Sequence, residues 1–180
     1  SSTSRGLGDV YKRQVIVTGG SGLIGREIVK DIVRKGGIAV NADIHVSTDL
    51  NKREIYVDIS DEQSVREVIR TVCQKFGRID GLVNCAYPRT KDWGTFFEEI
   101  PLDSWRKNVD LQLNSCFLFC QQVLEIMAEQ GSGAIVNIAS IYGIVGNDFT
   151  LYEGYGGTSP AAYSAIKGGI INFTRYLASY

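Results

Sequence analysis

Histidine is almost absent from this sequence, and none of its apolar stretches is long. His45 is the only histidine among 180 residues. A Ser-His-Asp triad needs a histidine as its base, and many zinc sites use several. We therefore expect neither a histidine-based triad nor a bound metal. No apolar run approaches the roughly 20 residues that span a bilayer, and the polar start lacks a signal core, so we expect no membrane segment.

Excess charge and cysteine are also scarce. The 19 basic and 20 acidic residues give a net charge of −1, with both signs interspersed, which does not favour binding to nucleic acid. The four cysteines are Cys73, Cys85, Cys116 and Cys120. The last two have helical spacing in an apolar run with no histidine nearby. We expect buried, reduced thiols in a cytoplasmic protein.

The two ends of the sequence differ from the rest. Residues 1–14 are polar and lack periodicity, and residues 9–14 read as the translation of a common transposon sequencing adapter. We expect residues 1–14 to be a non-native or disordered leader and residues 15–180 to be one domain. The helical pattern reaches Tyr180 without a capping glycine, so we expect an incomplete domain with an exposed sheet edge, poorly soluble or inactive by itself.

Short apolar runs alternate with helical patterns along residues 15–180. The expected strands are 15–17, 38–42, 55–57, 79–83 and 134–138, and the expected helices are 23–35, 60–76, 102–130 and 160–180. Ser60 is a plausible N-cap and Pro160 opens the last helix. Because each strand is almost continuously apolar, the pattern predicts an α/β fold with a doubly wound parallel sheet whose C-terminal strands are missing.

A glycine-rich turn joins the first strand to the first helix. It consists of Thr18, Gly19, Gly20, Ser21, Gly22, Leu23, Ile24 and Gly25. Glycines let the backbone approach a pyrophosphate, and the helix N-terminus offers unpaired N–H groups. We interpret the turn as a dinucleotide site, with a mere tight turn as the alternative.

Acidic residues follow the next two strands. Asp43 ends the second strand, where a carboxylate can accept both hydroxyls of an adenosine ribose and repels a 2′-phosphate. No arginine adjoins it, which favours NAD over NADP; the alternative is a solvated loop carboxylate. Asp58 and Ile59 follow the third strand and could flank the adenine, although Asp58 could equally start a helix.

Tyr163 and Lys167 are the main candidates for chemistry. Four residues apart on a helix, they share one face. An ammonium beside a tyrosine favours the phenolate and brings a pKa near 10 towards working pH. Ser140, at the tip of the fifth strand, could reach the same substrate oxygen, or could instead cap local backbone.

In this order the motifs resemble the short-chain dehydrogenase/reductase family over residues 15–180. Further matching elements are Asn84, Cys85 and Ala86 after the fourth strand and Asn114 in the long helix. The resemblance implies that Tyr163 transfers the proton, that Lys167 binds the nicotinamide ribose, that Ser140 orients the substrate and that Asn114 holds a relay water. Asn114 could alternatively be a buried structural group. The resemblance also implies a dimer or tetramer built on the helices 102–130 and 160–180.

Three features depart from the family pattern. The glycine spacing 19, 22, 25 is that of larger sugar-nucleotide-modifying members, and Tyr87 stands where glycine is usual. The connection from Ser140 to Tyr163 is about ten residues longer than usual and contains Tyr142, Phe149, Tyr152, Glu153 and Tyr155. Aromatic rings beside an acid suit a sugar, and the sequence resembles the bacterial surface-glycan and flagellin-sugar branch.

Three functions therefore compete. The first is an NAD-dependent dehydrogenase of a secondary alcohol, for which a sugar or sugar nucleotide is the candidate substrate. The second is a redox-neutral sugar-nucleotide epimerase or dehydratase, which the glycine spacing favours and which Asn84 and Asn114 disfavour. The third is a non-catalytic dinucleotide sensor, which the presence of both Tyr163 and Lys167 disfavours.

Overall fold

The computed structural model describes residues 12–180, so most of the expected leader lies outside the described residues. The chain forms two compact units, described here separately. The first comprises residues 12–86 and 118–136, and the second comprises residues 87–117 and 137–180. The expectation of a single domain over residues 15–180 stays a prediction. Within residues 12–180 no helix is long and apolar enough to cross a membrane.

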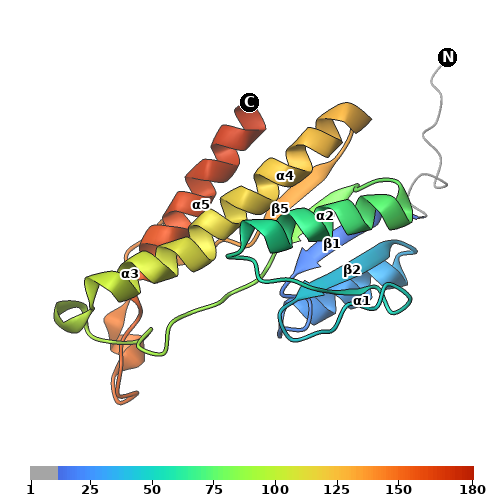
Figure 1. The fold of residues 1–180 in the computed structure, drawn as a ribbon. Helices are drawn as coiled ribbons and strands as arrows, with labels where there is room; N and C mark the ends of the chain where they lie inside the picture. The colour runs from blue at the N-terminus through green and yellow to red at the C-terminus, as the bar shows by residue number, and fades with distance from the viewer. Residues whose placement is uncertain (1–11) are drawn as a thin grey trace. The chain divides into compact units, whose positions relative to one another are not determined.

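The first unit is built on a parallel sheet (Figure 1). Its strands are β1 (Gln14–Thr18), β2 (Ile38–Asp43), β3 (Glu54–Tyr56), β4 (Gly81–Asn84) and β5 (Ala134–Asn137). They lie in the order β3-β2-β1-β4-β5. The chain therefore runs outward from β1 first to one side and then to the other, which confirms the predicted doubly wound α/β fold. The first strand begins at Gln14 rather than Val15, and the buried Gln14 pairs with Ile38.

Helices cover both faces of this sheet. Figure 1 shows α1 (Gly25–Arg34) and α2 (Glu62–Phe76) on opposite sides of β1 and β2. Right-handed crossovers require this, because the chain reverses its direction of travel across the sheet after β3. The fully buried core of the unit draws on strands and helices alike: Ile16, Val17, Val40, Val65, Val72, Ile79, Leu82, Phe119, Cys120 and Val123. Cys73 and Cys85 are only half-buried, so the expected burial of thiols holds for Cys116 and Cys120 alone.

The N-cap of α2 is Asp61, which corrects the prediction of Ser60. The Asp61 carboxylate accepts hydrogen bonds from Gln63 N and Ser64 N, each at 3.2 Å. Ser60 instead donates its N–H and hydroxyl to Asp58 Oδ1, at 2.9 and 2.7 Å. Either residue type can cap a helix. Here Ser60 is bonded to Asp58, so Asp61 caps the helix instead.

We expect Asp61→Ala to lower the free energy of unfolding by about 1 kcal/mol, because two N–H groups of the first turn lose their acceptor. Asp61→Ser keeps a capping oxygen and is the matched control. Chemical denaturation measures both variants, and equal losses would show that the carboxylate does not cap.

The second unit is helical. It contains η2 (Phe97–Glu99), α3 (Leu102–Val109), η3 (Asp110–Asn114), the first turn of α4 (Ser115–Gln130), η4 (Ile141–Gly143), η5 (Phe149–Tyr152) and α5 (Ala161–Ser179). The helix expected over 102–130 is therefore interrupted, because η3 is a π-helical turn. The Ser115 hydroxyl donates to Leu111 O at 2.7 Å within this turn. Such turns often occur at functional sites, and this one ends at Asn114.

Glycines allow the second unit to pack closely. A Cβ on Gly143 would lie 2.6 Å from the backbone carbon of Lys167, so η4 lies directly against α5. A Cβ on Gly169 would lie 3.1 Å from Leu113, on η3. The first contact places the backbone of η4, and the second the side chain of Leu113, against the part of α5 around Lys167.

Candidate functional site

In the first unit, the polar candidates lie at the carboxyl ends of β1, β2 and β4. Thr18 is in register with Ala42 of β2 and with Asn84 of β4. This is the point at which the strand order reverses, and open α/β sheets bind ligands there. The structure thus brings the glycine turn, Asp43 and the Asn84–Ala86 segment together.

Each glycine of the turn has a distinct geometric role. Gly19 has φ +67°, a conformation that side-chain-bearing residues rarely adopt. A Cβ on Gly25 would lie 2.1 Å from Gly19 O, so Gly25 permits the helix to start against the turn. A Cβ on Gly22 would meet only Gly19 O, at 3.2 Å, and otherwise point into open space. These are the roles that a tight turn, close helix packing and backbone access to a pyrophosphate require.

Thr18 holds the β4 loop to the glycine turn. Its buried hydroxyl accepts hydrogen bonds from Cys85 N at 3.1 Å and Ala86 N at 3.2 Å. The same oxygen lies 3.4 Å from Val83 O, to which it donates. Asn84 Nδ2 donates to Cys120 Sγ at 3.4 Å. Thr18 therefore ties the segment after β4 to the end of β1. The sequence did not predict this structural role.

We expect Thr18→Val to lower the free energy of unfolding by about 1–3 kcal/mol, because two backbone N–H groups lose an acceptor in a largely buried place. Thr18→Ser keeps the hydroxyl and should lose no more than about 1 kcal/mol for the missing methyl group. Thermal or chemical unfolding measures both. If the serine variant loses as much as the valine variant, the hydroxyl is not the cause.

Asp43 is a buried carboxylate with three donors. Its Oδ2 accepts from Ser21 N at 3.0 Å, and its Oδ1 accepts from His45 N and faces His45 Nδ1, both at 2.9 Å. Burial by itself would raise the pKa of Asp43, but the hydrogen bonds from His45 and Ser21 outweigh burial and lower that pKa. The carboxylate is therefore ionised at neutral pH and is held against the glycine turn.

Asp58 and Ile59 are less closely tied to this group. Both are half-buried, and the Asp58 carboxylate is occupied by Ser60. Val57, the residue before Asp58, donates its N–H to Asp43 O at 3.2 Å. Their expected place beside an adenine stays a prediction.

In the second unit, α5 carries Tyr163 and Lys167 as predicted. Lys167 is buried, and its Nζ donates to Ile138 O at 2.5 Å. The same ammonium lies 5.7 Å from the centre of the Tyr163 ring. This hydrogen bond attaches the lysine to the segment after β5 that leads into Ser140. The Tyr163 phenol and the buried Lys167 ammonium are thus neighbours on α5.

Ser140 and Asn114 each have a local partner. Ser140 Oγ accepts from Tyr142 N at 3.2 Å, so it does cap η4, the alternative raised by the sequence. A hydroxyl that accepts one bond still has a proton to donate, so a second role remains open to it. Asn114 is exposed, and its amide donates to Asp110 Oδ1 at 3.0 Å. The alternative of a buried structural asparagine is therefore wrong.

Tyr163 lies in an aromatic cluster with Tyr87 and Trp93. The sequence did not predict this cluster. Trp93 Nε1 donates to Tyr87 Oη at 2.8 Å, and the Tyr87 ring meets Tyr163 edge-on at 5.7 Å. Lys167 Nζ lies 5.8 Å from the Tyr87 ring centre. Burial raises the pKa of Tyr87, and the Trp93 hydrogen bond offsets part of that rise. In the sequence, Tyr87 is notable only because it stands where glycine is usual.

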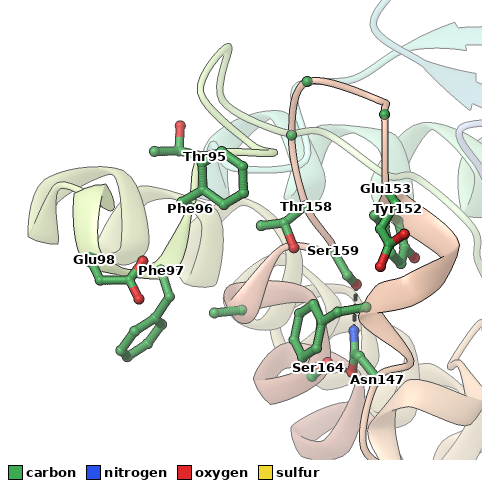
Figure 2. Close-up of a pocket in the computed structure, with 15 residues that line it drawn as sticks. Thr95, Phe96, Phe97, Glu98, Asn147, Tyr152, Glu153, Thr158, Ser159 and Ser164 are labelled. Carbon is green, nitrogen blue, oxygen red and sulfur yellow. Dashed lines mark hydrogen bonds between the residues drawn. The ribbon is translucent and has the colours of Figure 1, made fainter.

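A cavity of about 710 Å³ lies in the second unit (Figure 2). Its aromatic lining comes from Phe96, Phe97, Phe149 and Tyr152, and its acids are Glu98 and Glu153. Neither lysine nor arginine lines it.

Three polar residues that line this cavity are joined by hydrogen bonds. The Asn147 amide donates to the buried Ser159 hydroxyl, and the Ser164 hydroxyl donates to Asn147 Oδ1 at 2.7 Å. Figure 2 shows the first of these bonds as a dashed line. Asn147 therefore joins the long connection to Ser164 on α5 and to Ser159, which lies just before that helix. The aromatic residues and Glu153 of this connection stand out in the sequence, but the hydrogen bonds of Asn147 do not.

Comparison with known proteins assigns the chain to a family. The family model described as short chain dehydrogenase matches residues 13–180. Post-translational flagellin modification protein A of Campylobacter coli is 33% identical over 177 residues, covering 91% of this chain and 69% of that protein. The 7alpha-hydroxysteroid dehydrogenase of Bacteroides fragilis is 32% identical, covering 92% of this chain and 64% of that enzyme. The predicted resemblance is confirmed.

Solved structures agree. A short chain dehydrogenase of Leptospira borgpetersenii with bound NAD+ superposes with a TM-score of 0.82 at 30% identity, covering all of this chain and 70% of that one. Levodione reductase superposes with a TM-score of 0.80 at 29% identity, covering 94% of this chain and 66% of that one. The chain spans about two thirds of the length of the curated relatives it matches, 64% to 69% among the first four.

Proposed function

Since the chain belongs to the short chain dehydrogenase family, we propose that the protein is an NAD-dependent oxidoreductase. It transfers a hydride between the nicotinamide and a secondary alcohol or ketone. The observation that carries the proposal is the pairing of Tyr163 with the buried Lys167, whose Nζ lies 5.7 Å from the tyrosine ring.

The dinucleotide is held by residues of the first unit. Glycine backbone from Thr18 to Gly25 takes the pyrophosphate, Asp43 takes the ribose hydroxyls, and Asn84, Cys85, Ala86, Asp58 and Ile59 line the remainder. The fit rests on the open space at Gly22 and on the ionised Asp43. When bound, the nicotinamide supplies the hydride acceptor or donor.

The proton is handled by residues of the second unit. During oxidation, the Tyr163 phenolate takes the hydroxyl proton of the substrate, and Ser140 orients the substrate oxygen by hydrogen bonding. Lys167 stabilises the phenolate and binds the nicotinamide ribose. Asn114, exposed at the end of the π-helical turn, holds the water that returns the proton to solvent. Proton transfer by a positioned side chain typically contributes about 10²–10⁴ in rate.

The substrate we propose is a sugar, free or nucleotide-linked. The cavity offers four aromatic side chains for the apolar faces of a ring and two carboxylates for hydroxyl or amino groups. The likeness to a flagellin modification protein supports the same class. The protein acts in the cytoplasm as a dimer or tetramer, with the helices 102–130 and 160–180 at its interfaces; Phe117, 48% exposed and packed on Phe173, suits such a role.

The test is an NADH-release assay. The protein is incubated with NAD+ and a panel of amino sugars, nucleotide-linked sugars, steroids and simple secondary alcohols. We expect NADH release with at least one sugar and little with the rest. Failure of every compound to yield NADH, from protein that binds NADH, would contradict the dehydrogenase proposal.

A redox-neutral epimerase or dehydratase is the second candidate, because the glycine spacing 19, 22, 25 is typical of such enzymes. Mass spectrometry of the same reactions discriminates the two. A sugar isomerised or dehydrated without net NADH would favour the second candidate. A dinucleotide sensor would bind NADH and convert nothing.

A further inference from the structure

We propose that His45 makes the choice between NAD(H) and NADP(H) depend on pH. While His45 is neutral, Asp43 excludes the 2′-phosphate of NADP(H); once His45 is protonated, the pair admits it. The inference rests on the proposed function, which places a dinucleotide ribose at Asp43.

The geometry of the pair fixes the histidine tautomer. His45 Nδ1 lies 2.9 Å from Asp43 Oδ1. An ionised carboxylate can only accept hydrogen bonds, so Nδ1 must carry the hydrogen. The backbone N–H of His45 donates to the same oxygen at 2.9 Å. The ring is thus bound to the carboxylate that selects against the 2′-phosphate.

Protonation then changes only the outward nitrogen. The His45 side chain is 82% exposed, whereas that of Asp43 is 6% exposed. In the neutral ring Nε2 is an acceptor, which suits a ribose hydroxyl and repels a phosphate. In the imidazolium Nε2 becomes a donor and the ring gains a positive charge, which supplies what an arginine supplies in NADP-binding relatives of this fold.

Histidine is the residue type suited to this change. Histidine side chains change charge between about pH 5 and 8. The glycine turn and β1 bring no charged side chain to Asp43. The charged residues of the remaining neighbouring segments are these: Asp49, Lys52, Arg53, Glu54 and Asp58. Lys52 lies 3.7 Å from Asp49, and Ser60 occupies Asp58. The basic side chain that contacts Asp43 is therefore that of His45.

Binding and protonation are linked, and the sign is definite. A 2′-phosphate favours the imidazolium, so NADPH binding takes up a proton and the Kd for NADPH falls as pH falls. NADH carries no 2′-phosphate, so its Kd should change little. The 2′-phosphate itself loses charge near pH 6, which also eases its approach to Asp43, so the effect of the histidine must be separated from that of the ligand.

The experiment measures Kd for NADH and NADPH from nicotinamide fluorescence between about pH 5.5 and 8.5, a range that spans the charge change of histidine. It compares the natural protein with His45→Asn, whose amide nitrogen can keep the bond to Asp43 but never takes up a proton. The ratio of the Kd for NADPH to that for NADH should fall about tenfold more in the natural protein than in His45→Asn. His45→Arg, a permanent cation, should bind NADPH at every pH with the shallow dependence of the asparagine variant.

The outcomes separate the two proposals. If both coenzymes bind and the ratio changes equally in the natural protein and His45→Asn, the role of His45 is overturned while the proposed function stands. If neither coenzyme binds at any pH, both are overturned. Proton uptake on NADPH binding, measured by calorimetry in buffers of different ionisation enthalpy, should be present in the natural protein and reduced in His45→Asn.

Discussion

Tyr163→Phe is expected to lower kcat/KM by about 10²–10⁴, with an unchanged Kd for NADH. Phenylalanine keeps the ring that packs edge-on against Tyr87 and Trp93, at 5.7 and 6.4 Å between ring centres, so the second unit should stay folded. What is lost is the hydroxyl that we propose to exchange the substrate proton. The rate is measured with the compound that gives the greatest NADH release in the panel.

Tyr176→Phe is the matched control, because Tyr176 lies on the same helix but is 62% exposed and far along it from Lys167. It should keep full turnover. Turnover in Tyr163→Phe equal to that of the control would contradict a catalytic role for the phenol. Loss of NADH affinity in Tyr163→Phe would point instead to a structural defect.

The parallel sheet and the glycine turn could be predicted because their signals are local. A buried parallel strand is almost continuously apolar, and a turn with positive φ at Gly19 needs glycine. Once β1, β2 and β4 are parallel, their carboxyl ends share one sheet edge. The juxtaposition of Thr18, Asp43 and Asn84 therefore follows from topology rather than from any pairwise signal.

The π-helical turn could not be predicted, because one extra residue in a helix barely alters the apolar pattern. Two hydrogen bonds accompany the π-helical turn. One is local, from the Ser115 hydroxyl to Leu111 O at 2.7 Å, and the other is tertiary, from Gln112 Nε2 to Pro88 O at 2.8 Å. The choice of Asp61 over Ser60 as a cap has the same character. Both residue types cap well, and the Asp58 turn decides between them.

The aromatic cluster around Tyr163 could not be predicted from the sequence either. Tyr87 and Trp93 lie more than 65 positions before Tyr163 in the sequence, and aromatic pairing has no periodic signature. His45 illustrates a related limit. Counting histidines excluded a triad, but only the 2.9 Å contact with Asp43 gives the single histidine a partner.

The glycine turn offers the sharpest separation of folding from binding. Gly25→Ala would place a Cβ 2.1 Å from Gly19 O, which cannot be relieved without moving backbone. We expect the free energy of unfolding to fall by about 1–3 kcal/mol and NADH affinity to fall about a hundredfold, because the helix N-terminus proposed to face the pyrophosphate must move. Gly146→Ala, whose Cβ would meet nothing within 4 Å, is the control for adding a methyl group.

Gly22→Ala then distinguishes the two interpretations of the turn. Its Cβ would meet only Gly19 O, at 3.2 Å, so the fold should tolerate it with a change of about 0.5 kcal/mol or less. The methyl group would nevertheless occupy the open space in which we propose that the backbone contacts a phosphate. A stable Gly22→Ala variant with weakened NADH binding requires a ligand at this turn. If its NADH binding is intact while Gly25→Ala unfolds, Gly22 serves only the turn, and the pyrophosphate site must be sought elsewhere.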